Sequence, residues 1–152
     1  MNPVQDVVSQ IVGKRVWGAR PGHGSFLTLE FGTQVKKRPF PSGEWHLWIY
    51  CCAWKLSKNN TLVCHSESKN CTQIACNALD DKEFLSLSFE PESGASAFQF
   101  SEKFLLLTWP YDESEQWMLY MPNSQVLTYA HDGRYSLGSG EESHKVWDNM
   151  PQ

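Results

Sequence analysis

The sequence lacks the marks of several large protein classes. No run approaches the roughly 18 apolar residues of a membrane span, and the first residues show neither the basic nor the long apolar segment of a signal peptide. Lysine and arginine number 13 against 17 aspartates and glutamates, so the net charge is −4. These absences predict a cytoplasmic protein that spans no membrane and has no general attraction to nucleic acid.

Cysteine is scarce and irregularly spaced. The chain has five, an odd number; Cys51 and Cys52 are adjacent, and no Cys-x-x-Cys pair occurs. We therefore expect reduced thiols rather than a disulfide framework. The nearest approach to a metal-binding cluster combines Cys64-His65 with Cys71 and Cys76, but it lacks the spacing of a zinc site. No metal and no other cofactor is predicted.

Catalytic signatures are missing as well. Gly22-His23-Gly24-Ser25 has the composition of a turn and lacks the strand-to-helix context of a nucleophile elbow. Cys52 shares a predicted strand face with His46, yet six residues of strand separate them by about 20 Å, which excludes a dyad within one strand. No catalytic residue is predicted, and a non-enzymatic protein is favoured over an enzyme.

Aromatic residues, in contrast, are abundant. Seven Trp, eight Phe and five Tyr make up 13% of the 152 residues, enough for a dense core or an adhesive surface. A chain of this length forms one domain that can bury about 70% of its unfolded surface. We predict a single globular domain over residues 1–140, followed by a polar C-terminal tail over residues 141–152.

The stretch Gly43–Leu56 has the strongest pattern and predicts one long central strand. Alternation places Trp45, Leu47 and Ile49 on the side expected to face the core. The opposite side is also rich in apolar groups and carries His46, Trp48, Tyr50 and Trp54. Such a strand is either covered on both sides or keeps an aromatic face for a partner.

Elements of both types flank this strand. Helices are expected at 3–12, with Asn2 as N-cap, and at 71–79, with Asn70 as N-cap. Turn residues separate further strands, which are expected at 14–20, 25–31, 61–65, 83–90, 95–100, 104–109, 116–121, 125–130 and 134–137. This order predicts an α+β fold of mainly antiparallel strands, a sandwich or half-barrel with two short helices.

The two halves of the chain resemble each other weakly. Residues 3–68 and 70–137 both begin with a short helix that leads into hairpins, and Trp45 aligns with Trp117. The pattern favours two helix-plus-meander repeats related by a pseudo-two-fold axis. The alternative is chance similarity within an aromatic, hairpin-rich chain.

The favoured function is binding of another protein, as a hetero-partner or by self-association. A small bacterial immunity protein, antitoxin or accessory subunit would fit the acidic charge and the surplus of aromatic residues. The alternative is a small-molecule-binding domain or hydrolase with a pocket between the two halves. Single-stranded nucleic acid is disfavoured because few basic residues lie near the rings. The candidate binding residues are His23, His46, Trp48, Tyr50, Trp54, Tyr111, Asp112, Trp117 and Tyr120.

Overall fold

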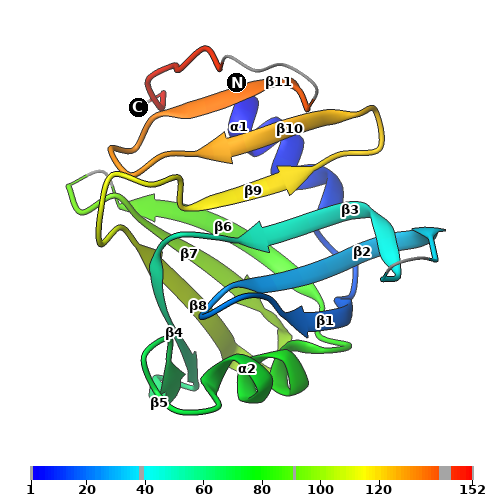
Figure 1. Cartoon of the computed structure of the whole chain (residues 1–152), viewed down its shortest axis with the longest axis vertical. Coiled ribbons are helices and arrows are strands. Elements are labelled where there is room, and N and C mark those ends of the chain that lie inside the picture. Colours follow the sequence, from blue (N-terminus) through cyan, green and yellow to red (C-terminus); the bar gives the residue numbers. More distant parts are fainter. Residues whose placement is uncertain (1, 38–39, 91, 141–144, 152) are drawn as a thin grey trace.

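Two antiparallel sheets pack face to face around a hydrophobic core (Figure 1). The computed structural model describes residues 2–37, 40–90, 92–140 and 145–151. The first sheet has the order β1-β2-β3-β9-β10-β11, and the second has the order β5-β4-β8-β7-β6. The strands are β1 Trp17–Pro21, β2 Leu27–Lys36, β3 Ser42–Ile49, β4 Ala53–Lys58, β5 Thr61–His65, β6 Phe84–Glu90, β7 Ala95–Phe100, β8 Phe104–Trp109, β9 Trp117–Tyr120, β10 Gln125–Tyr129 and β11 Tyr135–Ser139.

The predicted fold class is confirmed: the described chain is mainly antiparallel β-structure with two short helices. Helix α1 (Pro3–Val8) continues into a 3-10 turn at Ser9–Ile11. Its predicted cap is present, because the Asn2 side chain accepts a hydrogen bond from the Val4 N–H at 2.9 Å. Helix α2 (Cys71–Leu79) has the predicted bounds, but Asn70 is left-handed and makes no side-chain cap, so that prediction is wrong.

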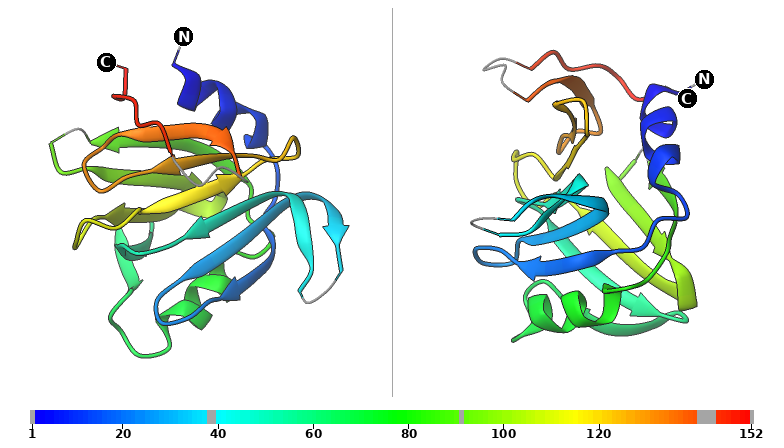
Figure 2. Two further views of the ribbon diagram at one scale, coloured as in Figure 1. Left: turned by 45° about the horizontal axis from the view of Figure 1, so that its top comes forward. Right: turned by 90° about the vertical axis from the view of Figure 1, so that its right-hand side faces the viewer.

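The sheets approach each other along one side through the segment that precedes β1. Phe84 donates its N–H to the Lys14 carbonyl, and the Val16 N–H bonds the Lys82 carbonyl. This pairing links the start of β6 to the start of β1, so the sandwich is partly closed at this edge. Figure 2 shows α1 and the C-terminus together at one end, where the Asn2 amide lies 3.9 Å from the sulfur of Met150.

The stretch from Gly43 to Leu56 is not one strand, which corrects the prediction. It is β3 in the six-stranded sheet, a bend at residues 50–52, and β4 in the five-stranded sheet. Trp45, Leu47 and Ile49 face the core as predicted. Beyond the bend the alternation starts again on the other sheet, so Trp54 also points inward and is fully buried. The bend reverses which side of the chain faces the core.

The strand order has an internal regularity. Three consecutive strands β1-β2-β3 lie in one sheet and lead to β4 in the other, and β6-β7-β8 lead back to β9 in the same way. In this order β9 corresponds to β4, whereas Trp45 and Trp117 lie in the hydrogen-bonded neighbours β3 and β9. The two tryptophans therefore do not occupy corresponding strands, and the duplication itself stays a prediction.

The sequence led us to expect reduced thiols throughout, and this prediction is wrong for two of the cysteines. Cys64 in β5 and Cys71 at the start of α2 form a disulfide, with their Cα atoms 5.6 Å apart. The chain reverses direction between β5 and α2 and brings the two residues together, although their spacing of seven matches no common framework. Cys51, Cys52 and Cys76 remain free thiols.

Part of the predicted C-terminal tail lies outside the described residues, namely 141–144 and 152. Asp148 forms a two-way backbone bridge with Tyr135 of β11, and Lys145 pairs with Glu115 at 3.6 Å. The described part of the tail thus runs along the edge of the six-stranded sheet. No helix among the described residues is long and apolar enough to cross a membrane.

Candidate functional site

A pocket lies on the outer face of the six-stranded sheet, the face turned away from the five-stranded sheet. Its volume is about 600 Å³, within the range of small-molecule sites. The end of the β2–β3 hairpin, described at residues 34–37 and 40–42 and called the arm below, projects beyond the neighbouring strands and contributes part of the wall (Figures 1 and 2). The described lining residues are Arg20, Val35, Lys36, Phe40, Ser42, Gly43, Glu44, His46, Trp48, Tyr120, Met121 and Pro122.

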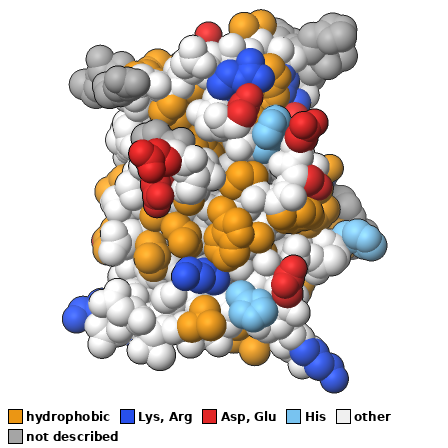
Figure 3. Space-filling model, turned by 90° about the vertical axis from the view of Figure 1, so that its left-hand side faces the viewer, with side chains coloured by type: hydrophobic (Ala, Val, Ile, Leu, Met, Phe, Trp, Pro, Cys, Tyr) orange, Lys and Arg blue, Asp and Glu red, His pale blue; other side chains and the backbone are white. Residues whose placement is uncertain are grey.

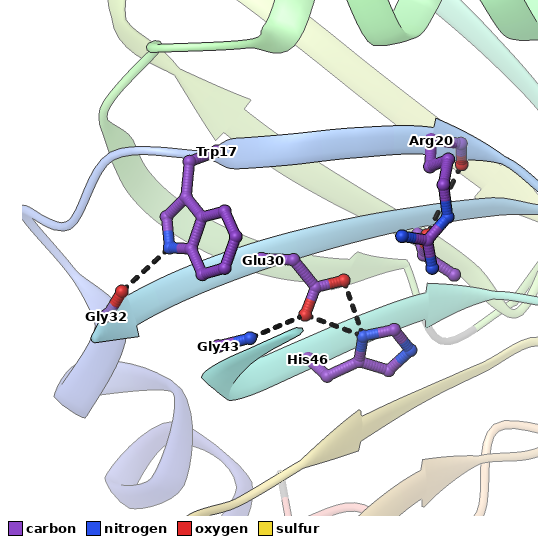
Figure 4. A network of polar contacts seen from close by, with 7 residues as sticks. Trp17, Arg20, Glu30, Gly32, Gly43 and His46 are labelled. Atoms are coloured by element: carbon purple, nitrogen blue, oxygen red, sulfur yellow. Dashed lines mark hydrogen bonds and ion pairs between the residues drawn. The ribbon is translucent and has the colours of Figure 1, made fainter. Parts of the chain in front are cut away.

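A buried carboxylate supports the floor of this pocket. Glu30 of β2 and His46 of β3 are directly opposite each other in the strand register. Glu30 is fully buried, and its two carboxylate oxygens lie 2.6 and 2.8 Å from Nδ1 of His46. A carboxylate can only accept, so Nδ1 carries the proton and donates it to Glu30. Nε2 of the ring has no hydrogen-bond partner among the described residues, and His46 lines the pocket (Figure 4).

Small residues allow the Glu30 carboxylate to be enclosed. The N–H of Gly43 donates to Oε1 of Glu30 at 3.0 Å. A Cβ at Gly43 would collide with the Phe31 carbonyl oxygen and would lie 3.1 Å from the Trp17 ring. Gly18 has a φ of +58°, and a Cβ there would lie 3.4 Å from Cγ of Glu30. The close approach of these strands around Glu30 thus depends on glycine.

The indole of Trp17 fixes the base of the arm. Its Nε1–H donates to the Gly32 carbonyl at 2.7 Å, beside an irregularity in the β2–β3 pairing. On the arm side the Glu44 carboxylate accepts the N–H of Thr33 at 2.8 Å. These bonds satisfy backbone groups that the irregular pairing leaves without ladder partners, and they hold the arm in place beside the pocket.

Two cations line the pocket without a carboxylate partner. Arg20 of β1 extends over β2 on the side of the sheet that carries His46 (Figure 4), and its guanidinium lies 4.2 Å from the centre of the Phe40 ring. Lys36 comes from the arm. Within the described parts of the chain, neither residue forms a salt bridge. Both charges are therefore available to a ligand.

Aromatic groups form the rest of the wall. Tyr120 of β9 lies 5.6 Å from the His46 ring, and burial raises the pKa of its hydroxyl, which is therefore neutral at pH 7. Trp48 belongs to the pocket and also to a cluster beside it, where its ring is 4.5 Å from Tyr50 and 6.1 Å from Phe26. Phe26, Trp48 and Tyr50 are all half-buried, so the pocket continues into a partly exposed aromatic surface.

The structure divides the predicted binding residues into three groups. His46, Trp48 and Tyr120 meet in the pocket, and Tyr50 adjoins them. His23, Tyr111 and Asp112 are exposed and line no part of it; Asp112 accepts hydrogen bonds from Ser114, which hold the pKa of its carboxyl below the usual value.

Trp54 and Trp117 are core residues, which corrects their prediction as surface groups. They are 0% and 1% exposed. The indole N–H of Trp54 donates to the Ser25 carbonyl, and that of Trp117 donates to Oγ of Ser96. Their polar atoms are therefore satisfied inside the sandwich, and neither ring is available to a partner.

The groups that line the pocket are able to form hydrogen bonds, ion pairs and stacking contacts. Ser42 lies on the same face of β3 as His46, but four residues of strand put them about 13 Å apart, too far for a Ser–His pair within the strand. The described residues contain no group of three or more His, Cys, Asp or Glu side chains that could hold a metal ion. The pocket presents a hydrogen-bonding imidazole, two cations and several aromatic rings to a ligand.

Sequence reasoning missed Glu30 and Arg20. Glu30 occupies a polar position in an alternating strand, where a carboxylate normally faces water. No local signal identifies it: counting back from the Lys36–Ser42 pair places Glu30 opposite Trp48, and only the two register shifts in the β2–β3 pairing bring it opposite His46. Burial of Glu30 also depends on Trp17 and on Gly43, and neither contact is visible in a strand pattern.

Comparison with known proteins gives no family for this chain. No protein-family model, no curated protein and no solved structure matches it.

Proposed function

We propose that this protein is a small-molecule-binding domain, and that its site is the pocket on the outer face of the six-stranded sheet. The observation that carries the proposal is the Glu30–His46 pair. A buried carboxylate is expensive, and an apolar pair of similar volume would support the sheet as well or better. Here the carboxylate orients an imidazole whose second nitrogen is open to a pocket of about 600 Å³.

The position of the pocket agrees with this function. Its lining residues come from residues 20–48 of the first half of the chain and from residues 120–122 of the second. Sites between two parts of a fold are common places for ligands, and a few convergent polar groups on an otherwise apolar wall provide orientation and specificity. His23 and Tyr50, which are also among the candidate binding residues predicted from the sequence, do not line the pocket.

A fragment screen by nuclear magnetic resonance tests the proposal. A library of several hundred small molecules is titrated into the ¹⁵N-labelled protein, and binders should shift the signals of His46, Trp48 and Tyr120. Trp48→Ala should weaken these binders, whereas Leu62→Ala, at a residue that is 53% exposed on β5, should not. No binders, or binders scattered over the whole surface, would overturn the proposal.

Binding of another protein is the second candidate, and the exposed aromatic groups support it. Hydrophobic side chains gather in the middle of the face drawn in Figure 3, with acidic and basic side chains and histidines around them. Tyr111 is 60% exposed, and the cluster of Phe26, Trp48 and Tyr50 keeps part of its surface in water. Aromatic anchors of this kind often dominate protein interfaces.

Self-association can be measured without knowing the partner. Sedimentation of the protein at several concentrations should show a dimer that Tyr50→Asp dissociates, whereas Lys55→Gln, on the other sheet, should leave it intact. A strictly monomeric protein would exclude the homomeric form of this candidate. An immunity, antitoxin or accessory role and a bacterial origin remain predictions.

The predicted cytoplasmic location is a separate proposal, and the Cys64–Cys71 disulfide is the observation against it. Stable disulfides are typical of oxidising compartments. Counting free thiols by mass spectrometry, on protein alkylated immediately after lysis of its source, distinguishes a cytoplasmic location from an oxidising compartment. Five alkylated cysteines support the cytoplasm, and three support an oxidising compartment.

A further inference from the structure

The charges around the pocket have a sign that suggests the chemistry of the ligand. Arg20 and Lys36 carry positive charges without a carboxylate partner among the described residues. The acidic group on the rim, Glu44, is already bonded to the Thr33 N–H. Glu30 is 0% exposed and is occupied by His46 and Gly43. Glu115, whose charge acts on Tyr120, is paired with Lys145 at 3.6 Å. A ligand in the pocket therefore meets cations that have no carboxylate partner and carboxylates that are already hydrogen-bonded or paired.

His46 adds a hydrogen-bonding group of fixed orientation. Because Glu30 holds the proton on Nδ1, Nε2 is the atom left for the ligand. In the imidazolium form Nε2 donates to an anion, and in the neutral form it accepts the proton of the corresponding acid. Both arrangements lead to the same contact, an acidic oxygen hydrogen-bonded to Nε2.

Flat rings surround these polar groups. Phe40, Trp48 and Tyr120 line the pocket together with the cations. The guanidinium of Arg20 rests on the Phe40 ring, so a cation–π contact holds it in place without neutralising its charge. A planar, unsaturated group has several rings to stack on, and stacked or edge-on contacts of this kind favour aromatic ligands.

Building on the proposed function, we infer that the ligand is a small molecule that combines an oxyanion, either a carboxylate or a phosphate, with a flat aromatic portion. The oxyanion contacts Arg20, Lys36 and Nε2 of His46. The aromatic portion lies against Trp48 and Tyr120. The ligand therefore needs two separable features, a negative charge and an aromatic ring.

Four probes that share the same ring system test whether the ligand needs both the negative charge and the ring. Calorimetry compares 1-naphthoate, 1-naphthyl phosphate, the neutral 1-naphthylmethanol and the cationic 1-naphthylmethylamine. At least one of the two anions should bind ten times or more as tightly as the alcohol, and the amine should bind most weakly. The comparison between naphthoate and naphthyl phosphate then identifies which oxyanion the site prefers.

Variants assign the effect to the pocket. Lys36→Gln changes an exposed residue and should leave the fold intact while it lowers anion affinity several-fold. The double variant Arg20→Gln/Lys36→Gln should remove the preference for anions but retain binding of the alcohol. Lys55→Gln, an exposed lysine on β4 outside the pocket, is the matched control and should change nothing.

The outcomes separate this inference from the proposed function. If the alcohol or the amine binds as tightly as the anions, the oxyanion is wrong and the small-molecule site stands. If anion binding is equally sensitive to Lys55→Gln, the contact is general attraction to surface charge and the inference fails. If none of the four probes binds while the fragment screen finds other binders in the pocket, the combination of ring and oxyanion is wrong. If neither experiment finds a binder, both proposals fail.

Discussion

Trp48 and Trp54 are six residues apart and have the same predicted facing, yet the structure uses them in opposite ways. Trp48 stands half-buried on the outer face of β3 and forms part of the pocket wall. Trp54 on β4 is fully buried, and its indole N–H is bonded to the Ser25 carbonyl at 2.7 Å. The difference arises at residues 50–52, where the chain leaves one sheet and enters the other. The alternation of side chains along a strand predicts which of them face the core only as long as the strand remains in one sheet.

The largest expected effect concerns these two residues. Trp54→Ala should lower the free energy of unfolding by about 3–5 kcal/mol, because it leaves a large cavity in the core. Trp48→Ala should cost roughly 1–2 kcal/mol, since part of the side chain is already in water, and should mainly weaken ligand binding. Denaturant unfolding followed by circular dichroism measures both changes. Equal losses of stability would contradict the assignment of Trp48 to a binding surface.

A second prediction concerns the Glu30–His46 pair on the outer face of β2 and β3. His46→Leu should destabilise the fold by about 2–3 kcal/mol, because it leaves the Glu30 carboxylate buried without its partner. Adding Glu30→Gln to this variant should recover most of the loss, since a neutral amide oxygen can still accept the Gly43 N–H. Unfolding of the single and double variants gives the comparison. Absence of recovery would mean that the charge of Glu30 is not what makes His46 important to stability.

The third prediction concerns β5, the neighbour of β4. Replacing Cys64 and Cys71 together by serine should lower stability by about 2 kcal/mol, because the bridge closes a short loop and limits the unfolded chain. Dithiothreitol should produce a similar loss in the original protein and none in the double variant. A melting temperature of the original protein that does not respond to the reductant would show that the bridge is absent in solution.

The smallest effect is expected at the bend itself. Burial raises the pKa of the Cys52 thiol to about 12, so at pH 8 only about one molecule in 10⁴ carries the reactive thiolate. Cys51 is half-buried and therefore more accessible. Iodoacetamide should label the native protein mainly at Cys51, so Cys51→Ser should slow labelling and Cys52→Ser should not. Fast labelling of Cys52 would indicate that the bend opens in solution.

Much of the fold was accessible from sequence patterns, for local reasons. The bounds of β5, β7, β8 and α2 were predicted as the structure has them, because turn residues and alternation mark these elements within a few positions of chain. The cap at Asn2 is similarly local, as its side chain reaches N–H groups two and three residues along the chain. The inward facing of Trp45, Leu47 and Ile49 follows from the two-residue repeat of a strand.

Apart from the local cap at Asn70, the errors share a different origin, since each depends on a neighbour from elsewhere in the chain. Trp117 looked like a surface aromatic, but its partner Ser96 is 21 residues away on the other sheet. Cys64 and Cys71 looked like ordinary thiols until the turn between β5 and α2 brought them together. The candidate site was only partly visible for the same reason: its rings were conspicuous, and its charges were not.

By itself, the sequence determined the type of each element, the facing of side chains within a strand and the wealth of aromatic groups, because these properties depend on neighbours a few residues apart. Only the tertiary structure decided that the stretch from residue 43 to residue 56 changes sheets. It also decided that Trp54 lies in the core while Trp48 lines the pocket, and that Glu30 is buried behind His46. Burial is a property of the assembled sheets. A carboxylate or a tryptophan acquires it only when distant strands, here β1 over Glu30 and the loop before β2 over Trp54, close around it.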